Sequence, residues 1–266
     1  MRWVLIIGCV WLALVVLAAT FQRQMIYLPD GSDPVRPADV DELRFTTADD
    51  LDLTAWWFSP DTEPASTILV APGNAGNRAN REPMARELVD RGHAVVLLDY
   101  RGYGGNPGRP SEDGIVADTR AAAEHLAGRD DVDADRLVYL GESIGTAAVA
   151  AVAADLPPAA LVLRSPFPEL ADVGSSAYPF LPVRTLLRER HPTTEHLRAY
   201  DGPTLVVAGG SDRIVRTALS RQVAEDADTD YVEVEGVGHN DPELFTGARF
   251  LDAVDAHVRD AVDPAD

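Results

Sequence analysis

Ser143 stands in the pattern Gly141-Glu142-Ser143-Ile144-Gly145, between an apolar run that predicts a strand and a stretch that predicts a helix. A tight strand-to-helix turn of this kind strains the backbone and exposes the serine hydroxyl above the edge of a sheet. The backbone N–H of Ile144 would then lie at a helix N-terminus, where it stabilises a developing oxyanion. The pattern predicts a nucleophilic serine; the alternative is an ordinary turn in which Ser143 caps the helix.

A serine hydroxyl needs a base, and histidine is the usual one. Where a nucleophile occupies such a turn, the chain order is serine, acid, histidine, so the base is expected on a loop after the last strand. His239 meets this expectation, whereas the other five histidines lie too early or inside the last helix; they are His93, His125, His191, His196 and His257. An unrelated loop histidine is the alternative.

The acid that orients the histidine is expected after the strand predicted at residues 204–208. Asp212 occupies that position, where a carboxylate can hold the imidazole in one tautomer. Asp241 is nearer to His239 in sequence, but it would point from the same loop and ranks behind Asp212. The alternative for Asp212 is a helix-capping aspartate.

A second oxyanion donor is expected from the loop Pro72-Gly73-Asn74-Ala75-Gly76-Asn77, where small residues let the main chain approach a substrate oxygen. We assign the backbone N–H of Asn74 to this role, with Ala75 as the alternative. A glycine-rich turn without a ligand would explain the same residues.

The elements that must position these residues are short apolar runs alternating with longer helix-like stretches. The runs predict strands at residues 43–46, 53–58, 67–71, 94–99, 137–141, 160–163, 204–208 and 231–234. The stretches predict helices at 81–91, 114–127, 146–154, 217–226 and 242–262. Their alternation predicts an α/β fold with a doubly wound, mostly parallel sheet. Residues 165–200 are too long for an ordinary connection and predict a small insertion or lid over the sheet.

The N-terminal residues 3–20 form an almost unbroken apolar run without charge, which is near the minimum length of a membrane-spanning helix. We expect a transmembrane anchor at residues 1–21, a juxtamembrane linker at 22–42 and the catalytic domain at 43–262. A cleaved signal peptide is the alternative. Arg2 lies before the run and Arg23 after it, and the α-amino group adds a charge that favours the catalytic domain on the extracytoplasmic side.

The chain carries 43 acidic and 23 basic residues, a formal net charge of −20. This balance excludes nucleic acid as an expected partner, because neutralising phosphates requires clustered basic side chains. The sequence contains no lysine, which fits either a GC-rich genome or adaptation to high salt. Cys9 is the only cysteine and lies in the apolar run, so no intramolecular disulfide is possible. We expect no cofactor and no metal; the oligomeric state is open.

With these residues in place, the chain resembles the α/β-hydrolase superfamily. More narrowly it resembles the membrane-anchored branch that includes depalmitoylase-like α/β-hydrolase-domain proteins and serine-aminopeptidase-like hydrolases. The resemblance runs from about residue 24 to the last helix, and further segments that carry it are residues 24–29, 99–104, 110–112, 211–215 and 238–239. Many relatives have His-Gly where this chain has Pro72-Gly73. The resemblance implies the α/β-hydrolase fold and a Ser-His-Asp triad, but it leaves the substrate open because one scaffold hosts many activities.

Three functional hypotheses follow. The first is hydrolysis of a carboxylic ester or thioester of an acyl or lipid-like substrate, whose acyl chain could lie against apolar insertion residues; these are Phe167, Tyr178, Phe180, Leu181, Leu186 and Leu187. These side chains could equally pack the lid onto the sheet. The second hypothesis is a peptidase or amidase with the same triad, in which Glu169 or Asp172 holds a charged terminus. The third is a membrane-anchored binding protein without activity.

Overall fold

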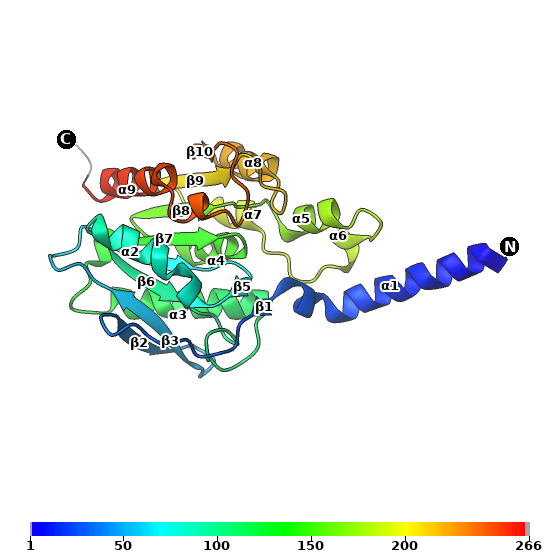
Figure 1. Cartoon of the computed structure of the whole chain (residues 1–266), viewed down its shortest axis with the longest axis horizontal. Helices are drawn as coiled ribbons and strands as arrows, with labels where there is room; N and C mark the ends of the chain where they lie inside the picture. Colours follow the sequence, from blue (N-terminus) through cyan, green and yellow to red (C-terminus); the bar gives the residue numbers. More distant parts are fainter. Residues whose placement is uncertain (1, 264–266) are drawn as a thin grey trace.

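The computed structural model describes residues 2–263. Its centre is an eight-stranded sheet in the order β10-β9-β8-β7-β4-β6-β3-β2 (Figure 1). β3 pairs antiparallel with both β2 and β6, and every other pairing in this sheet is parallel. The strands are β2 (Asp41–Thr46), β3 (Asp52–Phe58), β4 (Thr67–Ala71), β6 (Ala94–Leu98), β7 (Leu137–Glu142), β8 (Ala160–Arg164), β9 (Thr204–Gly209) and β10 (Asp230–Val234). The doubly wound, mostly parallel sheet predicted from the sequence is confirmed.

The five central strands, β4 and β6 to β9, are buried along their whole length. Their apolar runs do not alternate because both faces of the sheet are covered. Successive residues of β4 show this: Leu69 belongs to one hydrophobic cluster, and Ile68 and Val70 belong to the other. The edge strand β2 instead alternates between exposed and buried positions in its second half.

Helices cover both faces of the sheet. α3 (Glu112–Ala127), α4 (Ile144–Ala153) and α8 (Thr217–Ala227) pack into one hydrophobic cluster, and α2 (Glu82–Asp90) and α9 (Ala248–Val262) pack into the other. The prediction of a single helix over residues 242–262 is wrong. A 3-10 turn at Pro242–Leu244 precedes α9, and extended backbone at Gly247 separates them. A Cβ at Gly247 would lie 2.4 Å from the carbonyl oxygen of Glu243, so the tight break depends on glycine.

The insertion at residues 165–200 contains three short helices: α5 (Leu170–Ala177), α6 (Val183–Leu186) and α7 (Thr193–Leu197). Prolines interrupt helix formation here, since Pro182 precedes α6 and Pro192 precedes α7. α7 is anchored in the core by its buried side chains Thr193 and Leu197. The outer part of the insertion, residues 170–187, is called the lid below.

The N-terminal helix α1 (Arg2–Ile26) projects away from the sheet beside the lid (Figure 1). Its mean hydropathy reaches 2.8 over 18 residues and none of that window is buried, so its length and composition fit a membrane anchor or a signal sequence. The helix extends five residues into the segment predicted as a linker, with non-helical backbone at Phe21. A two-residue parallel pair follows, β1 (Leu28–Pro29) with β5 (Ala75–Gly76), which is too short to leave a sequence signal.

Candidate active site

Ser143 lies between the last residue of β7 and the first residue of α4, with φ 52° and ψ −113°. Positive φ at a non-glycine residue is strained, and such strain is stored where the fold holds a side chain in place. The two flanking glycines are required: a Cβ at Gly141 would lie 2.7 Å from the carbonyl oxygen of Gly145, and one at Gly145 would lie 2.2 Å from that of Ala71. The backbone N–H of Ser143 donates to the carbonyl of Arg164 at 2.9 Å, which fixes the turn to β8.

His239 and Asp212 are brought together from the loops after β10 and β9. The Nδ1 atom of His239 lies 2.6 Å from Oδ2 of Asp212, whose side chain is fully buried. The other carboxylate oxygen of Asp212 accepts the backbone N–H groups of Ile214 and Val215, both at 2.9 Å. Asp241, the rival acid, accepts the N–H of Gly238 within its own turn at 2.7 Å. The carboxylate beside the imidazole is therefore that of Asp212.

Ser143 and His239 line one cavity of about 670 Å³, together with Asn74 and Arg164. Among the hydrogen bonds of residues 2–263, none joins the Ser143 hydroxyl to the His239 ring. Catalytic hydrogen bonds often tighten only when substrate is bound. The site thus contains a strained, 7%-exposed serine and an oriented imidazole that face the same space.

The residue that carries the predicted second donor, Asn74, is held through its own carbonyl and its side chain. The carbonyl of Asn74 accepts the N–H of Leu28 at 2.8 Å and the hydroxyl of Tyr103 at 2.9 Å. The side-chain amide of Asn74 donates to the carbonyl of Ile26 at 2.7 Å. Within the described chain, the backbone N–H groups of Asn74 and Ile144 donate no hydrogen bond, and both residues line a cavity with Ser143. Ala75, the alternative donor, lies in β5.

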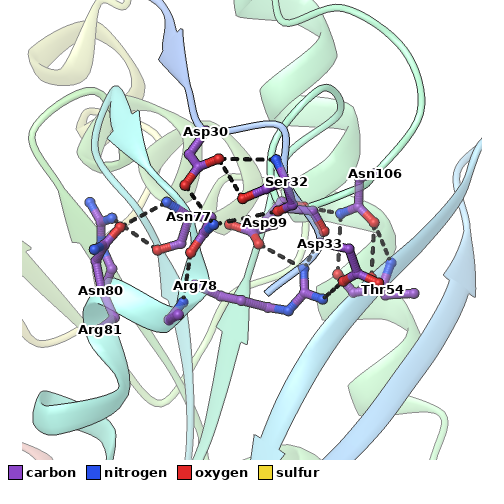
Figure 2. A network of polar contacts seen from close by, with 12 residues as sticks. Asp30, Ser32, Asp33, Thr54, Asn77, Arg78, Asn80, Arg81, Asp99 and Asn106 are labelled. Atoms are coloured by element: carbon purple, nitrogen blue, oxygen red, sulfur yellow. Dashed lines mark hydrogen bonds and ion pairs between the residues drawn. The ribbon is translucent and has the colours of Figure 1, made fainter. Parts of the chain in front are cut away.

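A polar network centred on the buried Arg78 holds the segment that directly follows this loop (Figure 2). Arg78, which is almost fully buried, donates to Asp99 at 2.8 Å, to the carbonyl of Gly104 at 2.8 Å and to Asp33 at 3.0 Å. Burial raises the pKa of the Asp99 carboxyl to about 6 despite the Arg78 guanidinium beside it. The motif at residues 99–104 therefore supports the loop.

Three buried charged residues lie directly behind the serine. Nε of Arg81 donates to the Glu142 carboxylate at 3.1 Å, and Nη2 of Arg164 lies 3.5 Å from the same oxygen. Burial would raise the pKa of Glu142, but the guanidiniums of Arg164 and Arg81 outweigh it and hold that pKa below its ordinary value. We call Arg81, Glu142 and Arg164 the charge cluster.

The charge cluster connects the loops that carry the other site residues. Nη1 of Arg164 donates to the carbonyl of His239 at 3.1 Å, and Nη1 of Arg81 donates to the carbonyl of Ala75 at 3.0 Å. Sequence reasoning missed this cluster. The available signal was Glu142, a charged residue that stands between an apolar strand and Ser143. Its partners could not be found from the sequence, because Arg81 lies 61 residues before Glu142 and Arg164 lies 22 residues after it.

A second, apolar cavity of about 290 Å³ meets the first at Ser143. Lid residues form much of its wall, and five of the six predicted apolar insertion residues contribute: Phe167, Tyr178, Leu181, Leu186 and Leu187. Phe180 does not line it and is 58% exposed at the tip of the lid. No charged side chain of residues 2–263 lines this cavity.

In the described part of the chain, no three His, Cys, Asp or Glu side chains are grouped so that they could hold a metal ion. The arrangement can perform nucleophilic attack by a serine, proton transfer by an imidazole and stabilisation of an oxyanion by backbone N–H groups. None of these steps needs a metal.

Comparison with known sequences agrees with the fold. A profile described as alpha/beta hydrolase fold matches residues 66–194. The chain is 50% identical over 242 residues to the uncharacterized protein Rv2307c of Mycobacterium tuberculosis, which covers 88% of this chain and 85% of the relative. It is 29% identical over 271 residues to the alpha/beta hydrolase domain-containing protein WAV2 of Arabidopsis thaliana, covering 90% and 88%.

Solved structures give the same result. The Pyrococcus furiosus esterase Pf2001 superposes with a TM-score of 0.73 at 16% identity, covering 89% of this chain and 98% of the esterase. Est1E of Butyrivibrio proteoclasticus, solved with ferulic acid bound, superposes with a TM-score of 0.63 at 19% identity, covering 81% and 96%. At these identities the likeness establishes a shared fold.

Proposed function

This chain belongs to the α/β-hydrolase family, and from that premise we propose that it is a serine hydrolase that cleaves carboxylic esters or thioesters of acyl or lipid-like substrates. The observation that carries the proposal is the 2.6 Å contact of His239 with a buried Asp212, facing the same cavity as the strained Ser143. This is the arrangement that a serine nucleophile requires.

In the proposed reaction, the Ser143 hydroxyl oxygen attacks the substrate carbonyl carbon while Nε2 of His239 takes the hydroxyl proton. Asp212 stabilises the imidazolium through Nδ1, and the N–H groups of Asn74 and Ile144 hold the oxyanion. Collapse of the tetrahedral intermediate breaks the bond to the leaving group, which receives the proton from His239. Water, deprotonated by His239, then hydrolyses the acyl-enzyme and restores Ser143.

The two cavities support an acyl substrate. The apolar cavity would hold the acyl chain, and the cavity that contains His239 would hold the leaving group, because the imidazole must reach that group's oxygen or sulfur. We favour the ester over the peptidase alternative, because Glu169 and Asp172 both pair with Arg184 and neither lines the apolar cavity.

We further propose that α1 anchors the enzyme in a membrane with the catalytic domain on the extracytoplasmic side, as in the membrane-anchored branch that the sequence resembles. Support comes from the 25-residue length of α1 and its uncharged interior. The extracytoplasmic side is kept as the expectation drawn from the charges that flank the apolar run.

The test treats the full-length protein in detergent with a fluorophosphonate probe, beside Ser143→Ala and His239→Ala, and weighs the intact chains. We expect one adduct on the parent, none on Ser143→Ala and slow labelling of His239→Ala. Turnover of p-nitrophenyl esters above that of aminoacyl p-nitroanilides would support esterase over amidase activity. A folded parent that takes no adduct would overturn the proposal and favour an inactive binding protein.

A further inference from the structure

The wall of the apolar cavity is shared between the lid and the N-terminal helix. Four residues of α1 line it: Ala18, Gln22, Met25 and Ile26. Their spacing of four, three and one places them on one face of a helix. The apolar helix α1 therefore also forms part of the wall of the cavity that Ser143 lines.

The lid is attached to α1 at two levels. At the base, the side-chain oxygen of Gln22 accepts the N–H of Arg188, the residue after the lid, at 2.8 Å, and its amide donates to the carbonyl of the lid residue Leu186 at 3.5 Å. Toward the N-terminus, the indole Nε1 of Trp11 donates to the carbonyl of Phe180 at 2.9 Å. Trp11 and Gln22 are separated by about 16 Å along the helix at 1.5 Å per residue. The lid thus runs beside the apolar part of α1.

The tip of the lid, residues 177–183, has the composition of a membrane-inserted segment: Ala-Tyr-Pro-Phe-Leu-Pro-Val. In lipid, backbone polar groups must find partners within the protein. Here Pro179 and Pro182 carry no N–H, and the N–H groups of Tyr178, Leu181 and Val183 donate to carbonyls within residues 174–181. Tyr178 and Phe180 expose 43% and 58% of their surface, although both are large and apolar.

The charged contacts that join the C-terminal part of α1 to the rest of this region involve Glu189. Glu189, just after the lid, accepts from Arg23 and from the hydroxyl of Tyr27, both at 2.7 Å. Glu189 also accepts the N–H of Glu112 at 2.5 Å. Within the lid, Arg184 is paired with Glu169 and Asp172, and the other charges lie at its base, while residues 177–183 and the facing turns of α1 carry none. This division matches a boundary between headgroups and hydrocarbon.

We propose that α1 and the lid tip together form a mouth within the bilayer, through which the acyl chain of a membrane-resident lipid ester or thioester enters the apolar cavity without crossing water. This proposal rests on the proposed function, and it makes α1 a substrate-binding element in addition to an anchor. The partner of the lid tip is the lipid bilayer.

The first experiment compares Ala18→Trp, which fills the cavity from α1, with Ala13→Trp, the same substitution at an exposed position of α1 outside the cavity wall. Full-length protein in phosphatidylcholine vesicles hydrolyses 4-methylumbelliferyl palmitate or soluble p-nitrophenyl acetate. We expect Ala18→Trp to lower the palmitate-to-acetate ratio of kcat/KM about tenfold or more. Ala13→Trp should keep the ratio of the parent. Met25→Trp repeats the test if Ala18→Trp does not fold.

The second experiment measures insertion of the lid tip without relying on catalysis. Since Cys9 is the only cysteine, Cys9→Ala provides a background in which Phe180→Cys or the exposed helix position Glu225→Cys carries an environment-sensitive nitrobenzoxadiazole label. We expect vesicles to brighten and blue-shift the label at 180 and to leave the label at 225 unchanged. An aqueous signal at 180 would overturn the proposal.

The two failures are distinguishable. A parent that hydrolyses both esters while Ala18→Trp behaves as Ala13→Trp would refute the role of α1 and leave the hydrolase assignment standing. A parent that hydrolyses neither ester would refute the proposed function, and the label at position 180 would still report whether the tip enters the bilayer.

Discussion

Replacing Glu142 by glutamine removes the only carboxylate of the charge cluster. The side chain is fully buried, and the substitution removes the carboxylate that pairs with two guanidiniums, those of Arg81 and Arg164, behind Ser143. Breaking a buried ion pair from one side costs about 3–5 kcal/mol. At about 2–4 °C per kcal/mol for a domain of this size, the melting temperature should fall by roughly 6–20 °C.

The same substitution should slow catalysis, because the charge cluster holds the backbone of His239 and Ala75. A displacement of about 1 Å in a reacting group can cost about a hundredfold in rate. We therefore expect a lower kcat with little change in KM for p-nitrophenyl butyrate, measured well below the melting temperature. The positioning role would also appear as slower fluorophosphonate labelling of Ser143.

The matched control is Glu225→Gln, which makes the same change on the exposed face of α8. A melting temperature for Glu142→Gln equal to that of Glu225→Gln would refute the reasoning, because it would mean that the buried charges are compensated without the carboxylate. A double-mutant cycle with Arg164→Met checks the assignment: contacting charges should give a non-additive result.

Three further outcomes are expected. Asp212→Asn should lower kcat by about 10⁴, because an amide favours the wrong tautomer of His239. Burial lowers the pKa of His191 from 6.5 to about 4, so the folded state disfavours its charged form; stability should decrease as pH falls from 6.5 toward 4, by about 3 kcal/mol, and His191→Asn should remove this component from pH-dependent denaturation curves. Gly145→Ala should prevent folding or strongly lower the melting temperature, because its Cβ would lie 2.2 Å from the carbonyl oxygen of Ala71.

Each outcome has a contrasting result. Asp241→Asn is the control for Asp212→Asn, and equal losses in the two variants would mean that the acid is misassigned. An unchanged slope of stability against pH in His191→Asn would show that this imidazole is not the group that titrates; asparagine tolerates the positive φ of 45° found there. Parent-like melting of Gly145→Ala would contradict the tight approach of α4 to β4.

Local patterns were sufficient for the framework of the site. The turn at Ser143 follows from glycine spacing between a strand and a helix, and the structure has both glycines in contact with backbone that leaves no space for a Cβ. All eight predicted strands are present within two residues of their expected bounds, because short runs of Val and Leu are typical of buried strands. The prediction of one helix over residues 242–262 was wrong because the extended backbone at Gly247 interrupts the helix, whereas the prediction relied on the periodic pattern of apolar residues.

The pairing of His239 with Asp212 was inferable because the carboxyl ends of parallel strands meet at one edge of a sheet, so loops far apart in sequence converge in a known order. The charge cluster was not inferable. Arg81, Glu142 and Arg164 come from three separate elements, and nothing local distinguishes a buried arginine from a surface one until the strands are packed.

The sequence by itself determined the strained turn at Ser143, the strand and helix order and the apolar character of α1, since each depends on backbone sterics or on hydrophobic periodicity within a few residues. Only the tertiary structure decided that α1 lies along the lid and lines the cavity at Ser143. That contact joins Trp11 to Phe180 across 169 positions. Side chains so far apart meet through the packing of whole elements, which no local pattern records.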